Sequence, residues 1–370
     1  MISSILVFLL VLSILVLVHE LGHFLVAKRF GVMVEEFGFG LPPRLFGKKI
    51  GETLYSINTL PFGGFVKLHG EDATEKLKNP KRSFLGKSKK VRMAIVVAGV
   101  VMNFILAIVA FGVVYSFSGI PRETKDVKIV DIAAGSPAQN AGLIVGDIVR
   151  LADKEKVESV NGFVGLVEKK KGEKFPLEVE RRTGNKSSIK TVYLTARKNL
   201  PEGEGPLGVI ITATEIYYPP VFLRPILGIY YGFGEAVFWG KNVTAALIGT
   251  IAGLLTGKVP QDIAGPVGIF AITSKAAQLG VLAVVNFVGI MSVNLAILNV
   301  LPFPALDGGR LLFIGIEKAI GRKVLPKVEA AIHAVGMIIL LALLLAVTAH
   351  DIIRLIAAGS ISGFLQGVVK

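Results

Sequence analysis

Two histidines and a glutamate near the start of the chain have a spacing that suits metal chemistry, in the run His19-Glu20-Leu21-Gly22-His23. On an α-helix, residues four apart lie on one face, so His19 and His23 can direct ring nitrogens at one Zn²⁺. Glu20 can then act as general base toward the attacking water. The alternatives are a chance match or a purely structural role. The apolar setting weighs against both, because a carboxylate in a membrane helix costs about 2.5–3.5 kcal/mol to insert.

A catalytic zinc also needs a third protein ligand and an open coordination position. Asp307 is the best candidate, because two prolines end an apolar segment before it and two glycines after it allow close backbone approach. An Asp-Gly-Gly turn without metal is the alternative. The remaining histidines are weaker candidates. His69 is expected in a loop, while His333 and His350 flank an apolar segment, where a histidine more often anchors a helix at the membrane interface.

The composition is that of a membrane protein with some soluble part. Of the 370 residues, 52% are hydrophobic and only 18% are charged, against about 25% charged residues in a soluble domain. The net charge of +14 could suit nucleic acid, but so apolar a chain more often places Lys and Arg at a cytoplasmic membrane face. We therefore expect a lipid bilayer and no nucleic acid as partner. The absence of Cys excludes disulfides, thiolate zinc sites and a cysteine nucleophile.

Four segments are long and apolar enough to cross a bilayer as helices. They cover about residues 2–18, 93–118, 281–301 and 334–348. A cleaved signal peptide is the alternative for the first, but this segment lacks a basic start and a small-residue cleavage site. Residues 217–256 are rich in aromatic side chains, which favours a helix lying in the membrane interface over a fifth crossing.

Basic residues set the expected orientation. They cluster between residues 28 and 92 and again between 310 and 327, which places both segments in the cytoplasm by the positive-inside rule. Four crossings then leave both chain ends outside and bring the histidine motif and Asp307 to the cytoplasmic side.

The chain is thus expected to have three parts. Residues 1–120 form a membrane part in which the alternating residues 53–68 are expected to form a β-hairpin or looped strands, and residues 216–370 form a second membrane part. Between them, residues 121–215 have short β-like runs broken by Gly, Pro and charge, which predicts a small soluble domain outside the membrane. The predicted fold class is a polytopic α-helical membrane protein with an inserted β-rich domain.

The motifs together closely resemble the site-2 protease family of intramembrane zinc metalloproteases, in particular its bacterial RseP-like branch, the RIP metalloproteases. The resemblance rests on the His-Glu-Leu-Gly-His run and on the later Asn-x-x-Pro-x-Pro-x-Leu-Asp-Gly-Gly run at residues 299–309. Further matches lie at residues 62–66, 99–104 and 265–269. The resemblance covers most of the chain.

The resemblance implies a role for each matching residue. Zinc binding falls on His19, His23 and Asp307, the catalytic base on Glu20, and substrate contact on Asn294 and Asn299. It also implies a multi-pass protein of the bacterial cytoplasmic (inner) membrane. Such an enzyme cuts transmembrane segments of single-pass membrane proteins in regulated intramembrane proteolysis, for example an anti-sigma factor or signal-peptide remnants.

The two asparagines cannot act alike on an unbroken helix, because five residues place them about 140° apart. We expect Asn299 to orient the metal site or the loosened helix end, and Asn294 to hydrogen-bond the substrate backbone. The alternative is that both merely bond neighbouring helices.

Residues 134–149 contain a Gly-Ser-Pro-Ala run followed by Ala-Gly-Leu and Gly-Asp, and look like the helix and turn of a bacterial PDZ domain. Such a domain binds an extended peptide by strand addition, whereas a β-rich shield without a ligand is the alternative. Well-studied RseP-like proteins carry two tandem PDZ domains, and this segment has room for one.

Two other function classes are alternatives. A membrane scaffold that binds a peptide through the PDZ-like domain, without proteolytic activity, would be favoured if Glu20 or a ligand were missing. A transporter predicts charged sites in two repeated halves, and the sequence has no such duplication. We therefore expect a zinc endopeptidase.

Overall fold

The computed structural model describes residues 2–71, 79–184, 186–201, 203–257, 264–322, 324–360 and 363–364. The chain divides into two compact units. One unit comprises Met1–Phe117 with Val221–Lys370, and the other comprises Ser118–Pro220.

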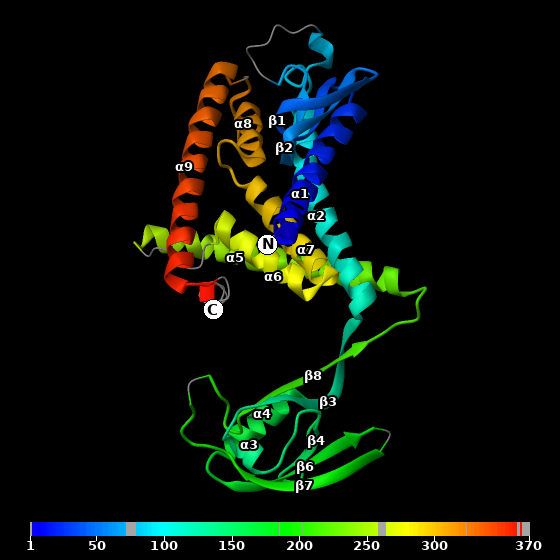
Figure 1. The fold of residues 1–370 in the computed structure, drawn as a ribbon, viewed down its shortest axis with the longest axis vertical. Coiled ribbons are helices and arrows are strands. Elements are labelled where there is room, and N and C mark those ends of the chain that lie inside the picture. Colours follow the sequence, from blue (N-terminus) through cyan, green and yellow to red (C-terminus); the bar gives the residue numbers. More distant parts are fainter. Residues whose placement is uncertain are drawn as a thin grey trace. The chain divides into compact units, whose positions relative to one another are not determined.

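The first unit is built mainly from helices (Figure 1). They are α1 (Ile2–Arg29), α2 (Lys89–Ser118), α5 (Arg224–Leu255), α6 (Pro266–Leu279), α7 (Val281–Val300), α8 (Asp307–Ile320) and α9 (Pro326–Ala358). Within the described residues, five of them are long and apolar enough to cross a membrane: α1, α2, α5, α7 and α9. Four of these contain the predicted spans, so a protein with several membrane helices is confirmed. The short helices α6 and α8 were not predicted.

Packing of α1, α2 and α7 forms the centre of this unit. Phe287 and Val288 of α7 pack against Val11 and Leu15 of α1 in one apolar cluster. Phe111 of α2 belongs to a second cluster that also includes side chains of α5 and α7. The histidine motif therefore lies on a continuous helix that packs among other helices of this unit.

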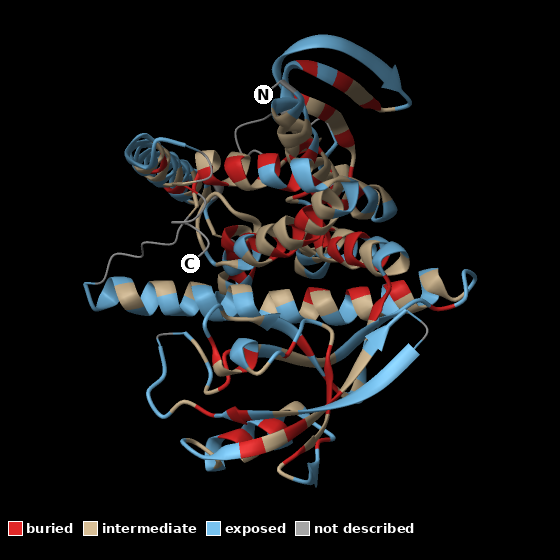
Figure 2. Ribbon diagram, turned by 60° about the horizontal axis from the view of Figure 1, so that its bottom comes forward, coloured by how far each residue is buried: buried red, intermediate tan, exposed pale blue. Residues whose placement is uncertain are grey.

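Helix α5 crosses the direction of α1, α2 and α9 (Figure 1). Its first half packs closely on α2, because a Cβ at Gly232 would come within 2.6 Å of the Gly112 nitrogen. Its second half is mostly exposed (Figure 2). A helix with one packed end and a long apolar exposed end suits a lipid surface.

Strands β1 (Val34–Ile50) and β2 (Thr53–Leu68) form an antiparallel sheet beside α1. Both strands are bent, so four segments lie side by side in the order 44–50, 53–58, 36–39 and 64–68. Residues 53–68, predicted as a β-hairpin or looped strands, form one bent strand, β2, whose two halves pair with opposite sides of residues 36–39 and not with each other. A short 3₁₀ helix, η1 (Pro80–Arg82), follows.

The second unit is a sheet with strand order β7-β6-β4-β3-β8, with β5 paired to β4. Its elements are β3 (Ile120–Ile132), α3 (Pro137–Asn140), β4 (Ile148–Ala152), β5 (Glu155–Lys156), α4 (Val160–Lys169), β6 (Lys174–Thr183), β7 (Lys186–Thr195) and β8 (Val209–Tyr217). Val149, Phe163 and Leu177 lie in its apolar core. Residues of the predicted PDZ-like run have local structural roles, since the Ser136 hydroxyl caps α3 and the buried Asp147 carboxylate pairs with Arg181.

Candidate metal centre

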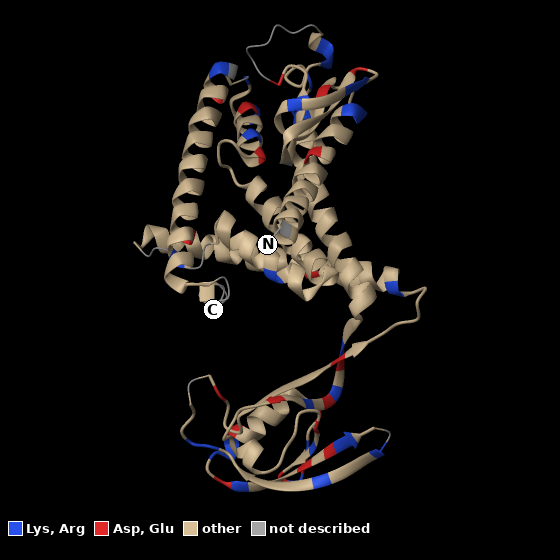
Figure 3. Cartoon of the chain, in the orientation of Figure 1, with Lys and Arg blue, Asp and Glu red and all other residues tan. Residues whose placement is uncertain are grey.

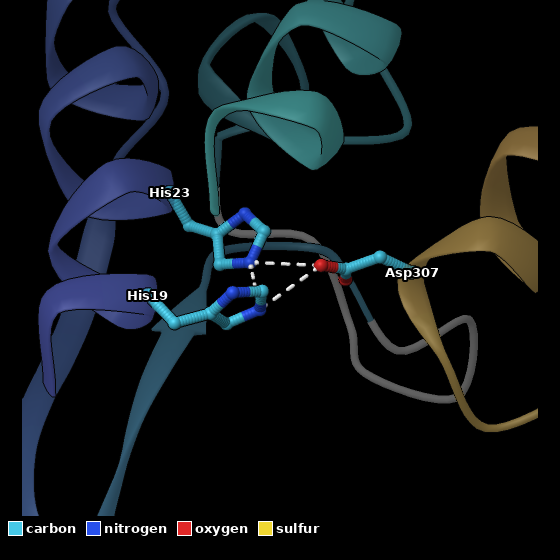
Figure 4. A group of neighbouring side chains, drawn as sticks. All are labelled: His19, His23 and Asp307. Atoms are coloured by element: carbon cyan, nitrogen blue, oxygen red, sulfur yellow. Dashed lines mark hydrogen bonds and ion pairs between the residues drawn. The ribbon is translucent and has the colours of Figure 1, made fainter. Parts of the chain in front are cut away.

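Three side chains from distant parts of the chain converge in the first unit (Figure 4). His19 and His23 project from α1, and Asp307 is the first residue of α8. The Asp307 Oδ2 atom lies 3.0 Å from Nε2 of His19 and 3.3 Å from Nε2 of His23. The two Nε2 atoms are 3.1 Å apart.

This donor set fits a zinc ion. Ligand atoms bound tetrahedrally at about 2.0–2.2 Å lie about 3.3 Å from one another, close to the separations seen here. Both histidines are buried, and the buried Asp307 Oδ2 makes no hydrogen bond among the described residues. A cation between the three groups would satisfy this oxygen and separate the two imidazoles.

The backbone of α2 sets the tautomer of His23. The His23 Nδ1 atom lies 2.8 Å from the Ile95 carbonyl oxygen, which can only accept a hydrogen bond. Nδ1 therefore carries the proton, and Nε2 keeps its lone pair for a metal.

Asn103 of α2 lies beside the Nδ1 atom of His19. Its side-chain nitrogen stands 3.3 Å from the His19 Nδ1 atom, while its oxygen is buried without a partner among the described residues. With the two amide atoms exchanged, the oxygen accepts the Nδ1 proton and no unsatisfied group remains. His19 would then also present Nε2 to the metal. The sequence reasoning assigned Asn103 no role, although a polar residue inside an apolar span was a signal.

Two glycines allow α1 and α2 to approach this closely. A Cβ at Gly22 would come within 2.3 Å of the Ala98 carbonyl oxygen. A Cβ at Gly99 would come within 2.4 Å of His23 Nε2. The histidine pair is thus pressed against the bare backbone of α2.

Asp307 is held by a tight turn between α7 and α8. Ala305 has φ +78°, a left-handed conformation that costs a residue with a Cβ about 1–3 kcal/mol. A Cβ at Gly308 would come within 2.0 Å of the Leu301 carbonyl oxygen. The Asp-Gly-Gly run therefore begins a helix that folds back against the end of α7.

A cavity of about 580 Å³ opens at the three groups. Glu20, the predicted general base, lines it, and so does Asn299. The Asn299 side-chain nitrogen lies 3.5 Å from His19 Nε2. Asn294 is not among the described residues that line this cavity, and its amide donates to the Ile290 carbonyl oxygen of its own helix at 2.9 Å.

Further polar residues line the cavity that the sequence reasoning did not place there. Arg310 forms an ion pair with Glu71, and both lie at the cavity wall. Burial alone would lower the pKa of Arg310, but the nearby Glu71 and Asp307 carboxylates outweigh it and raise this pKa. His333 also lines the cavity, so its interpretation as an interface anchor was incomplete.

Comparison with known proteins identifies the enzyme class. Residues 7–343 match peptidase family M50. A Clostridium perfringens protein is 36% identical over 347 residues, covering 93% of this chain and 97% of that protein. Zinc metalloprotease RasP of Geobacillus kaustophilus is 30% identical, and the match covers 95% of this chain and 98% of the relative. Regulator of sigma-W protease RasP of Bacillus subtilis is 27% identical, and the match covers 96% of this chain and 99% of that relative. The chain belongs to peptidase family M50, the site-2 protease family, and is a zinc-dependent metalloprotease.

Proposed function

We propose that this enzyme cuts transmembrane segments of single-pass membrane proteins, with zinc held by His19, His23 and Asp307. The main support for the proposal is the convergence of these three groups within a unit of apolar helices, at a cavity that Glu20 also lines. The scaffold without activity finds no support, because every member of the motif is present and the family is one of zinc peptidases.

The residues of the site divide the chemistry between them. When bound, zinc supplies Lewis-acid polarisation of the scissile carbonyl and of water. Glu20 stands beside the ligand His19 and accepts the proton of the attacking water, then returns it to the leaving amine. The buried walls limit bulk water, which strengthens the electrostatic interactions within the cavity.

The sheet beside α1 offers a place for an extended substrate. Phe65, Val66 and Leu68 of β2 line the cavity, and residues 64–68 form an outer segment of the sheet. A strand added at such an edge gains main-chain hydrogen bonds and exposes its peptide bonds. A substrate held there would run past Glu20 in the unwound form that hydrolysis needs.

We further propose four crossings, with α5 in the membrane interface. The Ser116 hydroxyl donates to the Arg224 carbonyl oxygen, so α5 begins beside the end of α2. Ser274 of α6 bonds the Ser4 hydroxyl at the start of α1. In the proposed topology both contacts lie on the outer side of the membrane. The chain from the start of α5 to α6 therefore makes no net crossing.

The charge distribution supports the orientation. In the first unit, most Lys and Arg lie around β1, β2 and the neighbouring helix ends (Figure 3). We propose that this side faces the cytoplasm of a bacterial inner membrane and that the second unit, a PDZ-like domain, lies outside. An extended peptide is its proposed ligand. A Bacillus subtilis relative is named for regulation of sigma-W, and an anti-sigma factor is accordingly one proposed substrate class here.

A substrate trap tests the proposal. Glu20→Gln should retain zinc and lose 10²- to 10⁴-fold in turnover, because an amide cannot accept the proton. Membrane stubs that accumulate with this variant, and not with the unchanged enzyme, should be identified by mass spectrometry. Near-normal cleavage by Glu20→Gln would place the base elsewhere, and stubs without a membrane segment would contradict the substrate class.

A further inference from the structure

Helix α9 is attached to the rest of the first unit at two places. Among the described residues of this 33-residue helix, only Gly336 and Asp351 are buried. The Asp351 carboxylate accepts the Gly268 N–H at 2.8 Å, at the start of α6. Gly336 lies against the turn that precedes Asp307, where a Cβ would come within 2.3 Å of Pro304. One of the two attachments of α9 is therefore the zinc-site turn itself.

A hydrogen bond from the same turn reaches His333, one helical turn before Gly336. The Ala305 backbone N–H donates to the His333 Nδ1 atom at 2.9 Å. Nδ1 must then be unprotonated, and in a neutral imidazole the proton lies on Nε2. The Nε2 atom is buried and has no partner among the described residues. The ring is thus oriented by Nδ1 and by its packing on Phe313, whose ring centre is 5.6 Å away.

Ala305, which donates this hydrogen bond, has a strained backbone. Ala305 has φ +78° and lies two residues before Asp307. A left-handed alanine persists only where its surroundings determine its conformation. A partner for the Ala305 N–H lowers the free energy of this conformation relative to others that would move Asp307.

We propose that His333 is a positioning residue of the zinc site, which acts by accepting the Ala305 N–H and so links α9 to the turn that presents Asp307. The inference rests on the proposed role of Asp307 as a zinc ligand. Hydrogen-bonded groups behind metal ligands typically change metal affinity 10- to 100-fold when they are removed.

Two amide substitutions separate the nitrogens of the ring. In His333→Asn, the side-chain oxygen can take the place of Nδ1 and accept the Ala305 N–H. In His333→Gln, the amide can replace Nε2 but offers no acceptor at the Nδ1 position. His333→Ala removes both, and His350→Ala, at an exposed position of α9, is the matched control.

The full-length variants in detergent should be titrated with zinc against a competing chelator, with metal content and peptide cleavage measured in parallel. We expect zinc affinity 10- to 100-fold weaker in His333→Ala and His333→Gln, and near-normal affinity in His333→Asn and His350→Ala. Normal affinity in His333→Ala, or rescue by Gln and not by Asn, would overturn the proposal. If His333→Ala fails to fold, the Asn and Gln variants still decide.

A steric variant tests the same link without changing His333. Gly336→Ala should push α9 away from Pro304 and weaken zinc binding, whereas Gly315→Ala, whose Cβ meets nothing within 4 Å, should not. Unchanged affinity in Gly336→Ala would show that α9 is not coupled to the turn. Asp307→Ala distinguishes the two proposals. If this variant retains zinc, the assignment of Asp307 as a ligand fails. If this variant loses zinc while the His333 variants keep it, only the role of His333 fails.

Discussion

The two arms of the candidate zinc site, one carrying the histidines and the other Asp307, are built by different means. His19 and His23 lie on a regular helix, and their spacing alone places both rings on one face. Asp307 follows an irregular turn that contains a left-handed alanine. In the helical arm, α2 sets the ring tautomers and leaves room for the rings, whereas the position of Asp307 depends on contacts with the end of α7 and with α9.

The two arms should differ in how they respond to a change in a neighbouring element. A helix keeps its side-chain spacing when a neighbour moves, because its hydrogen bonds are internal. A turn held by tertiary contacts changes when any of those contacts is lost. Small perturbations should therefore reach the site more readily through the Asp307 arm.

The largest expected effect is removal of a ligand from either arm. His23→Ala and Asp307→Ala should each lose both zinc and cleavage, because two protein ligands hold a catalytic zinc poorly. Metal content by mass spectrometry and cleavage of a membrane substrate are the measurements. Stoichiometric zinc in His23→Ala would break the assignment of the helical arm.

Added methyl groups should disturb each arm separately. Gly99→Ala places a Cβ within 2.4 Å of His23 Nε2, and Gly308→Ala places one within 2.0 Å of the Leu301 carbonyl oxygen. Both should weaken zinc binding at least 10-fold, and Gly308→Ala should also lower the melting temperature of the zinc-free protein, since its clash is with backbone. Gly249→Ala, which meets nothing within 4 Å, is the control. Equal melting temperatures for all three would contradict the distinction between the arms.

Loss of the Asn103 amide should have a smaller effect, confined to the helical arm. Asn103→Ala leaves the His19 Nδ1 proton without an acceptor, and zinc affinity should fall about 10-fold, at the lower end of the range for such partners. Asn103→Asp, which retains an acceptor, should recover most of the lost zinc affinity. If zinc affinity is equal in Asn103→Ala and the unchanged enzyme, the amide does not set the tautomer.

The smallest expected effects concern the two asparagines of α7. Asn299→Ala, next to His19, should mainly slow turnover, whereas Asn294→Ala should raise KM for a membrane substrate and leave zinc content unchanged. Kinetics with the purified variants separate the two effects. If both cleave normally and only melt earlier, by about 0.6–2 kcal/mol in unfolding free energy, the asparagines serve helix packing.

Much of this molecule could be predicted from local sequence. The four strongly apolar segments, the β character of residues 53–68 and the candidate ligands all follow from periodicity, length and residue type. These features are local because helix geometry and side-chain hydrophobicity act over a few residues. The short helix α8 was missed, since its first residues resemble a turn.

Other features appear only in the tertiary structure. His19 and Asn103 are 84 residues apart, and Ala305 and His333 are 28 apart, so no spacing rule relates them. The close contact of α5 with α2 at Gly112 likewise leaves no local signal in the chain. The sequence by itself determined which residues could bind zinc and that they lie among apolar helices. Only the fold decided which tautomers, turns and neighbouring helices present them, because a hydrogen bond depends on distance and direction in space and leaves no periodic pattern in the chain.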